Sequence, residues 1–484
     1  MALMRLPDAN ERFALGQERR KQIRRMQHKI WKAKDRRESP LKLLDASTRG
    51  RVPALVALKN QLMAESPFGY FRGAVPVMAY DLSLTMNTGI RTQLCGDAHV
   101  RNLGAFAAPD GRLVFDINDF DETIVGPFEW DVKRMATSLV LAGRGAGARN
   151  LDCREAAAVF LERYRVMMAT FARMPVLEVA RYQVHRLRNV ASVGGILRIA
   201  ERATPMHTLL TLTEVERTAA VAATKAEATK TESTKAKRTK PEMAETQDRV
   251  FKTLPPRLTR VKGELAEQVV GSLTKYAESL LPERRHFLAQ YRPVDVAFKV
   301  VGTGSVGLRD YCVLMDGNGP RDPLFLQIKQ EVASGYAPYV AVGARKIGQH
   351  HGRRVVEGER AMQLQSDPFL GWTTLEGRDY LVRQLNDHKA SVQLEDLKAA
   401  GLLEYAAVCG EMLARGHARA GDCSMMAGYI GRSTRFDDAV GAFAEEYADQ
   451  TELDWKELVQ SLKKTGKKVA EKKTAKKKKA RKKK

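Results

Sequence analysis

Residues 95–122 have the sequence CGDAHVRNLGAFAAPDGRLVFDINDFDE, and this stretch decides how the rest of the chain is interpreted. Asp97 and Asn102 lie five positions apart, and Asp119 follows a short apolar segment that we expect to form a strand. This D-x-x-x-x-N spacing, with a further aspartate behind it, is typical of sites that transfer phosphoryl groups with the help of metal ions.

The side chains of this stretch suit a site for Mg²⁺ and ATP, or another nucleoside triphosphate. Asn102, Asp119 and Asp121 offer the oxygen ligands that Mg²⁺ prefers, and the metal would offset the charge of the triphosphate. Asp97 would accept or orient the proton of an attacking hydroxyl. His99 lies in the same catalytic loop, where we expect it to form hydrogen bonds, because Asp97 already occupies the position of the base.

Two other interpretations of the acidic residues are weighed against this one. A calcium loop of the EF-hand type would begin at Asp116, but its sixth position is Asp121 instead of glycine and its twelfth is Pro127 instead of glutamate. A turn that is merely capped by carboxylates stays open as an alternative. Against it, four carboxylates crowd into one short turn and require counter-charge, namely Asp116, Asp119, Asp121 and Glu122.

A second motif lies in residues 294–331, where apolar residues alternate around Gly302, Gly304 and Gly307 and Lys329 follows on an expected strand. The segment after the third glycine has the pattern of a strand, whereas a dinucleotide-binding turn would need a helix there. A glycine-rich hairpin followed by a lysine on a strand is the arrangement of a kinase small lobe, where both contact phosphates. An ordinary hairpin with bends stays open as an alternative.

Two further residues complete the expected site. Residues 353–365 should form a helix that carries Glu357 and Glu359, and we prefer Glu357 as the partner of Lys329. Arg72 should support the loops or contact phosphate.

Other local patterns predict the elements around these motifs. We expect a turn-like aromatic cluster over 66–73, helices over 75–83, 127–147 and 154–174, and strands over 88–96 and 112–119.

Length and composition exclude several classes of protein. A chain of 484 residues should form two or three units. The five cysteines include no C-x-x-C pair, so neither a zinc knuckle nor a disulfide framework is indicated, and a reducing cytoplasm fits best. We find neither an N-terminal apolar region nor an uncharged stretch of the ~18 residues that a membrane span needs, so we expect no membrane insertion.

The positive charge is concentrated at the two ends of the chain. Of the net charge of +24, residues 463–484 carry +13 and residues 1–51 carry +9, which leaves +2 for residues 52–462. The Lys-rich C-terminal tail should be disordered by self-repulsion and could bind nucleic acid or another polyanion without sequence preference, which would place the protein at the nucleoid. A solubilising tether is the plainer alternative.

The motifs together resemble a bacterial family called domain of unknown function 2252. The resemblance covers about residues 53 to 447, apart from a Lys/Thr-rich insertion, and is carried by SPFGYFRG, CGDAHVRNLG, NDFDET, GPFEWDVKR, GTGSVG, LQIKQE, DPFLGW and YLVRQLNDHKASV. More remotely, GDAHVRN and NDFDE resemble motifs of aminoglycoside and choline phosphotransferases. That resemblance implies a catalytic Asp97, metal ligands Asn102 and Asp119, and an Asp131 that braces the loop, while Cys95 stands where those enzymes have histidine.

The order of the motifs differs from that of kinases, because the glycine-rich part follows the catalytic loop in this chain. Residues 409–422, CGEMLARGHARAGD, resemble the helix that directly precedes the catalytic loop in phosphotransferases. We therefore expect an α+β, protein-kinase-like, two-lobed fold that is circularly permuted, with the helical large lobe first and the β-rich small lobe later.

This fold divides the chain into six expected segments. They are a basic helical extension (1–52), a large-lobe part with the catalytic-type loop (53–223), a low-complexity Lys/Thr-rich insertion (224–248), a β-rich small lobe with the glycine-rich loop and hinge (249–390), a helical return to the large lobe (391–455) and a Lys-rich disordered tail (456–484). The expected function is an ATP- and Mg²⁺-dependent phosphotransferase for a small hydroxyl or amino acceptor. The alternative is an inert kinase-like scaffold that binds nucleotide or nucleic acid.

Overall fold

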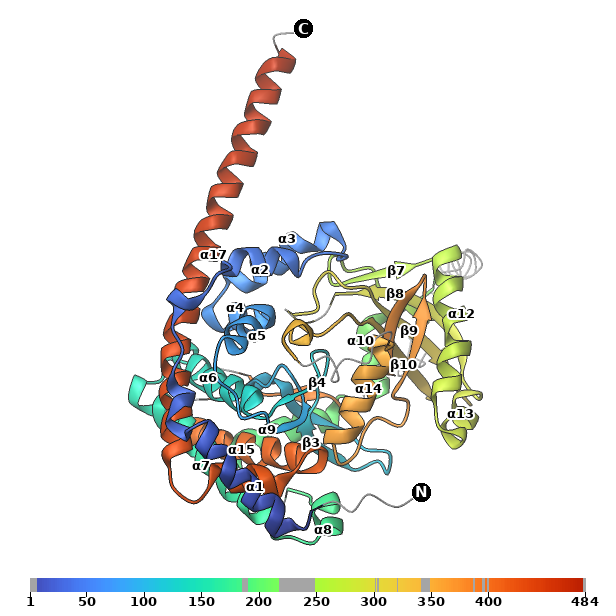
Figure 1. Ribbon diagram of the computed structural model, residues 1–484. Coiled ribbons are helices and arrows are strands. Elements are labelled where there is room, and N and C mark those ends of the chain that lie inside the picture. Colours follow the sequence, from blue (N-terminus) through green and yellow to red (C-terminus); the bar gives the residue numbers. More distant parts are fainter. Residues whose placement is uncertain are drawn as a thin grey trace, which may run out of the picture.

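The computed structural model in Figure 1 describes residues 7–184, 190–216, 249–300, 302, 304–319, 321–340, 349–385, 388–393, 397 and 400–481. The Lys/Thr-rich insertion at 224–248 lies outside these residues. The described chain combines helices with short strands, which confirms the α+β class.

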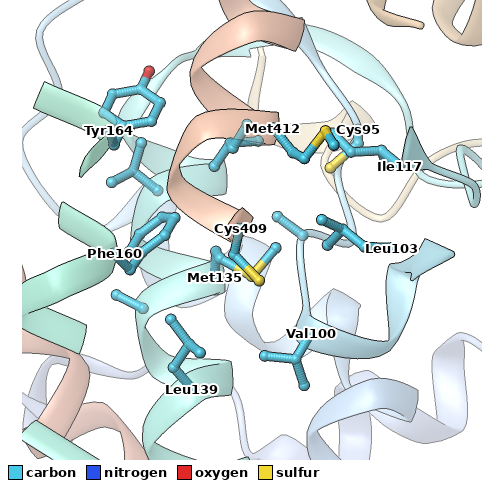
Figure 2. Close-up of a cluster of buried hydrophobic side chains, with 14 of the residues drawn as sticks. Cys95, Val100, Leu103, Ile117, Met135, Leu139, Phe160, Tyr164, Cys409 and Met412 are labelled. Atoms are coloured by element: carbon cyan, nitrogen blue, oxygen red, sulfur yellow. The ribbon is translucent and has the colours of Figure 1, made fainter. Parts of the chain in front are cut away.

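A helical part is built from segments at both ends of the chain. Helices α6 (Glu129–Gly145) and α7 (Asn150–Phe171) pack with α15 (Ala400–Ala420), α16 (Cys423–Ile430) and α17 (Arg435–Arg481). The motif stretch contributes apolar side chains to the same core. Figure 2 shows this cluster, in which Cys95, Val100, Leu103 and Ile117 of the motif stretch lie with Met135, Leu139, Phe160, Tyr164, Cys409 and Met412 of the helices. The loop that carries Asp97 is therefore anchored in the core.

A six-stranded antiparallel sheet forms the other part of the fold. Its spatial order is β11 (Gly371–Leu375), β12 (Arg378–Gln384), β10 (Pro323–Gln330), β9 (Asp310–Asp316), β8 (Arg292–Lys299) and β7 (Leu258–Val261). Every residue of β9 and β10 is buried, because successive side chains point to opposite faces and both faces are covered. Helix α12 (Glu264–Ser279) packs on one face, and α10 (Pro205–Leu212) packs on the other.

Helix α14 (His351–Met362) connects β10 to β11 and lies against β11 and β12. In the middle of the sheet, Lys329 of β10 is paired with Asp310 of β9 and Leu381 of β12. The register of the strand therefore determines on which face of the sheet the Lys329 side chain lies.

Short sheets and helices complete the described chain. β1 (Arg91–Leu94) pairs with β4 (Ile124–Pro127), while β2 (Leu103–Ala107) lies between β13 (Ala390–Ser391) and β3 (Leu113–Ile117). β5 (Thr213–Val215) pairs with β6 (Arg249–Phe251). The remaining helices are α1 (Ala9–Gln22), α2 (Pro40–Ala46), α3 (Pro53–Ala64), α4 (Pro67–Gly73), α5 (Val75–Ser83), α8 (Val176–Arg181), α9 (Ala191–Arg202) and α13 (Pro282–Leu288), with the 3₁₀ turns η1 (Arg25–Lys29), η2 (Ala33–Asp35), η3 (Val100–Asn102) and η6 (Ala337–Tyr339).

Most of the local expectations are confirmed, but the one for residues 66–73 is wrong. Helices α5, α6, α7 and α14 and strands β1 and β3 lie within or overlap the predicted segments. Residues 67–73, expected as a turn, instead form α4. The Ser66 side chain accepts a hydrogen bond from the Gly69 N–H, and Pro67 occupies the first helical turn, so the segment has ordinary signals for a helix start.

The expected disorder of the C-terminal tail also differs from the structure. Helix α17 continues to Arg481, and Figure 1 shows its last part projecting away from the rest of the protein. Lys, Ala and Glu favour helix, and a helix that is already packed needs no new nucleation to continue, which opposes the charge repulsion. No helix in the described part of the chain is long and apolar enough to cross a membrane.

The basic N-terminal segment packs on the helical part through a close contact between α1 and α16. A Cβ atom at Gly428 would lie 2.1 Å from the carbonyl oxygen of Phe13, so only glycine allows the two backbones to approach this closely. We predict that Gly428→Ala lowers the free energy of unfolding by about 1–3 kcal/mol in urea titrations. Gly271→Ala in α12, where a Cβ has open space, should leave it unchanged or raise it by up to about 1 kcal/mol. Equal effects of the two substitutions would contradict this account.

Candidate active site

Asp97 lies at the centre of a charged cleft and is held by a buried arginine. The Arg134 guanidinium of α6 donates two hydrogen bonds to Asp97 Oδ1, from Nε at 2.8 Å and from Nη2 at 2.5 Å. Burial raises the pKa of Asp97, and the neighbouring Arg134 opposes that rise. Because 17% of the Asp97 side chain stays exposed, the second carboxylate oxygen can be reached from the cleft. A carboxylate with a raised pKa is a better proton acceptor than an ordinary surface aspartate.

Asp131 braces the backbone of the same loop. Its carboxylate accepts hydrogen bonds from the N–H groups of Cys95 (2.8 Å) and Gly96 (3.1 Å). His417 Nε2 of α15 lies 3.3 Å from Asp131 Oδ2, the oxygen that also accepts from Cys95, and His417 Nδ1 lies 2.8 Å from the hydroxyl of Tyr164. Asp131 is completely buried, so these partners replace the water that it loses.

Asn102 and His99 keep the loop in its conformation. The Asn102 side-chain amide donates to the carbonyl of Asp97 at 2.7 Å, and Asn118 N–H donates to the Asn102 carbonyl at 2.9 Å. His99 Nδ1 accepts from the Arg101 N–H, and its Nε2 lies 3.6 Å from Asp97 and 3.4 Å from Arg72 Nε. Burial, followed by the nearby Arg72, lowers the pKa of His99 well below its usual value, which keeps the ring neutral. A neutral, fixed His99 acts as a hydrogen-bonding residue.

The acidic turn after β3 meets the sheet at Lys329. The Lys329 ammonium donates a short hydrogen bond to Asp121 and lies 3.9 Å from Asp119 Oδ1. Burial alone would raise the pKa of Asp121, but the charge and hydrogen bond of Lys329 lower it. The pKa of Asp119 is raised by burial and by the adjacent Asp121. The site therefore joins two residues of the turn to a lysine more than two hundred positions later in the sequence.

The glycine-rich segment between β8 and β9 closes over this turn. Gly302 and Gly307 adopt positive φ angles of 53° and 95°, which other residues rarely adopt. Ser305 Oγ donates to Asp121 Oδ2 at 2.8 Å, and a Cβ at Gly304 would lie 3.6 Å from the Arg72 carbonyl. The structure therefore brings all three predicted glycines to the cleft region, and Gly302 and Gly304 line the cleft itself.

The structure does not bring Glu357 to Lys329. Glu357 lies on the outer side of α14, where its carboxylate pairs with Arg353 at 2.7 Å and accepts from Gln349. Glu359 is the buried glutamate of this helix, and burial, opposed by Arg383 and Lys389, raises its pKa to about 7. Two positions along a helix correspond to opposite sides, and Glu359 shares the side of the buried Val355 and Met362. The preference for Glu357 is therefore corrected.

The cleft itself encloses about 720 Å³, including the open space at its mouth. Its walls come from the catalytic-type loop, the acidic turn, the glycine-rich segment and the region between α2 and α5. The predicted residues that line it are Arg72, Asp97, His99, Asn102, Asp119, Asp121, Gly302 and Gly304. One depression thus collects residues that the sequence analysis drew from two distant motifs.

The residues of the cleft fit a divalent cation only in company with a phosphate-bearing ligand. The described residues contain no group of three or more His, Cys, Asp or Glu side chains that could hold a metal ion. However, Asp121 Oδ1 is buried without a hydrogen-bond partner among the described residues, and 36% of the Asp119 side chain is exposed to the cleft. Mg²⁺ commonly uses one or two carboxylates and completes its shell with phosphate oxygens and water, which matches such a pair.

Several residues of the site were not predicted. Arg134 follows Asp131 by three positions on the same helix, so it had to face the same loop, and that spacing was a usable signal. Arg354 of α14 donates to the carbonyls of Asp121, Thr123 and Val332 and thereby fixes the acidic turn. Arg51 and Lys59 also line the cleft, but their local sequence has no pattern that indicates it.

The fold and the cleft define an α+β protein whose charged site lies between a helical part and an antiparallel sheet. The family model described as an uncharacterized protein conserved in bacteria (DUF2252) matches residues 51–461, so the chain belongs to this family. The family expected from the sequence motifs is confirmed. No match is found among curated proteins or among solved structures.

Removing the lysine should leave two half-buried carboxylates without their nearest counter-charge. We predict that Lys329→Met lowers the free energy of unfolding by about 3 kcal/mol at pH 8. Lys329 holds the pKa of Asp121 low, so in the wild type this carboxylate is ionised both at pH 8 and at pH 5.5. In the variant, burial raises the carboxyl pKa values, protonation relieves the repulsion, and the loss should be smaller at pH 5.5.

Urea titrations of both proteins at the two pH values measure this difference. Lys275→Met, at an exposed position of α12, serves as the matched control and should change stability by less than about 0.5 kcal/mol at either pH. A loss that is equal at pH 8 and pH 5.5 would contradict the assigned role of Lys329.

Proposed function

We propose that the protein is a kinase-like phosphotransferase that uses a nucleoside triphosphate such as ATP together with Mg²⁺. The observation that carries this proposal is the position of Lys329 on β10, 3.9 Å from Asp119 of the acidic turn. Lysine on a sheet strand, a glycine-rich turn and a metal-type aspartate are the parts that kinases assemble around the phosphates of ATP. Lys329 contacts the two aspartates of the turn that lines the cleft, and this arrangement favours the proposed function over an acidic turn that is only capped.

Each residue of the site then has a distinct task. Lys329, which is bonded to Asp121, and the backbone of Gly304 and Ser305, which line the cleft, would contact phosphate oxygens. Asp119, Asp121 and Asn102 would hold Mg²⁺, which neutralises the charge of the triphosphate. Asp97 would orient the hydroxyl or amine of a small acceptor and take its proton. Arg134 fixes Asp97 in one orientation, which is the positioning on which phosphoryl transfer chiefly depends.

The unusual order of the parts is consistent with a circular permutation. Gly421, directly after α15, forms an antiparallel bridge with Thr92 of β1, and the Thr92 hydroxyl donates to the His417 carbonyl at 3.3 Å. The end of α15 therefore lies beside the strand that leads into Cys95 and Asp97. This is the neighbourhood expected if a helix that precedes the catalytic loop in phosphotransferases had been moved behind it in the sequence.

Binding of nucleotide and metal tests the proposal directly. We expect the intact protein to bind the ATP analogue AMP-PNP in isothermal titration calorimetry, and Mg²⁺ to tighten this binding. Asp119→Asn should reduce the Mg²⁺-dependent gain by at least about tenfold, because it removes a charged ligand. Asp97→Asn should retain binding and lower turnover by about 10²- to 10⁴-fold once an acceptor is found.

Asp110→Asn is the control, since Asp110 pairs with Arg112 at the exposed β2–β3 turn and should leave binding unchanged. A wild-type protein that binds no AMP-PNP with or without Mg²⁺ would overturn the enzyme proposal. Mg²⁺-independent binding that Asp119→Asn leaves intact would instead favour an inert nucleotide-binding scaffold.

For the C-terminal end of α17 we propose non-specific binding of nucleic acid or another polyanion. Residues 463–484 carry +13, lie beyond the segment matched by the family model, and follow Leu462, which still packs on the body of the protein. We predict that deletion after Leu462 removes most of the salt-dependent association with DNA, measured by fluorescence anisotropy at several salt concentrations. The truncated protein should melt at the same temperature as the full chain, which would show that the rest of the fold is intact. Unchanged DNA affinity at low salt would contradict this role.

A further inference from the structure

The wall of the cleft that faces the acidic turn is basic and comes from the chain before the catalytic-type loop. Arg51, Lys59 and Arg72 line it, together with Ser47 and the start of α5. The acidic residues of the cleft lie on the loops from 97 to 122 and at Glu331. Charges of opposite sign therefore lie on different walls of the cleft. This arrangement suits a ligand, or a pair of ligands, that binds a metal ion at the acidic wall and places an anionic group against the basic wall.

Lys59 is the exceptional residue of this wall. It lies on α3, has only 2% of its surface exposed and lines the cleft. Its ammonium forms no ion pair or hydrogen bond with any residue that the structure describes, and the charged groups that act on it are Arg51 and Glu122. Glu122 is already engaged, because its carboxylate accepts from the Gly335 N–H at 2.6 Å.

The other buried cations around the cleft have partners. Arg134 is bonded to Asp97, Lys329 to Asp121, and Arg354 to three backbone carbonyls. Arg51 donates to the carbonyls of Ser47 (3.0 Å) and Val306 (2.6 Å). Lys59 is thus left as a buried amine without a partner among the described residues, and its charged form is costly unless an anion pairs with it.

The position of this wall relates it to Asp97. Arg72 Nε lies 3.4 Å from His99 Nε2, which in turn lies 3.6 Å from Asp97. Arg51 contacts the far end of the glycine-rich segment, at Val306 and Gly307. The basic wall therefore extends from the glycine-rich segment, at Arg51, to the residue proposed to receive the acceptor, at Arg72.

We propose that Lys59, with Arg51 and Arg72, forms an anion-binding subsite that receives a phosphate or carboxylate group of the acceptor substrate. The acceptor is then an anion, such as a phosphorylated or carboxylated small molecule that also carries a hydroxyl or amino group. Binding of an anion at Lys59 stands on the structure alone, and its assignment to the acceptor rests on the proposed phosphotransferase function.

Sulfate is a suitable probe, because it is an anion that resembles both groups and keeps its charge near neutral pH. We expect the full chain to bind sulfate in isothermal titration calorimetry and Lys59→Met to weaken that binding by at least tenfold. Lys42→Met is the matched control, because Lys42 is 75% exposed and pairs with the exposed Glu38, and it should bind sulfate as the wild type does. Equal sulfate affinity of Lys59→Met and wild type would overturn the subsite.

A second measurement needs no variant. Sulfate should protect Lys59 from acetylation by acetic anhydride, as mapped by mass spectrometry, and should leave the acetylation of Lys42 unchanged. Equal acetylation of Lys59 with and without sulfate would likewise overturn the subsite.

Saturation with Mg²⁺ and AMP-PNP separates the acceptor from the nucleotide. Sulfate binding that persists with nucleotide bound supports the acceptor assignment, and sulfate that competes with AMP-PNP would overturn it in favour of a nucleotide phosphate. If AMP-PNP does not bind at all, the proposed function fails, while Lys59-dependent sulfate binding still supports the anion site.

Discussion

The buried ammonium of Lys329 is the constraint on which the site depends. A charge near the end of β10, where every neighbouring residue of the strand is buried, is tolerated only if carboxylates approach it. Asp121 and Asp119 supply them from the helical part, and Ser305 joins the same carboxylate from the glycine-rich segment. Because these groups come from separate parts of the fold, the pairing fixes the distance between the sheet and the acidic turn and thereby defines the cleft.

Two buried residues of α6, Asp131 and Arg134, hold the catalytic-type loop in its position. Asp131 fixes the backbone of Cys95 and Gly96 and contacts His417, while Arg134 on the next turn of α6 fixes Asp97. The loop is thus held by one helix from the first half of the chain and one from the second half. Apolar side chains of the loop sit in the core that these helices share, so its position follows from packing as much as from hydrogen bonds.

The sequence allowed the site to be predicted where the signal was local. Asp97, Asn102 and Asp119 line the same cleft because the short β2–β3 hairpin joins the segments that carry them. The alternation of apolar residues around Lys329 likewise indicated a strand. The choice of Glu357 failed because that side chain points outward to Arg353, while the carboxylates beside Lys329 come from Asp119 and Asp121. Lys59 could not be found, because its isolation results from the packing of α3 against distant segments, which no spacing in the sequence encodes.

The burial of Lys59 raises the question of why the cleft contains a lysine that has no partner among the described residues. Lys59 is buried deeply enough that its pKa falls to about 7, mainly through desolvation and then through the like charge of Arg51. An apolar side chain of similar length would fill the space without that cost, so stability alone does not account for a lysine at this position. Ionic groups that reduce stability are commonly retained at binding sites, where the ligand supplies the missing partner. The basic wall around Lys59 is therefore best understood as a feature of ligand binding, whereas the acidic turn opposite it also joins the helical part to the sheet through Lys329.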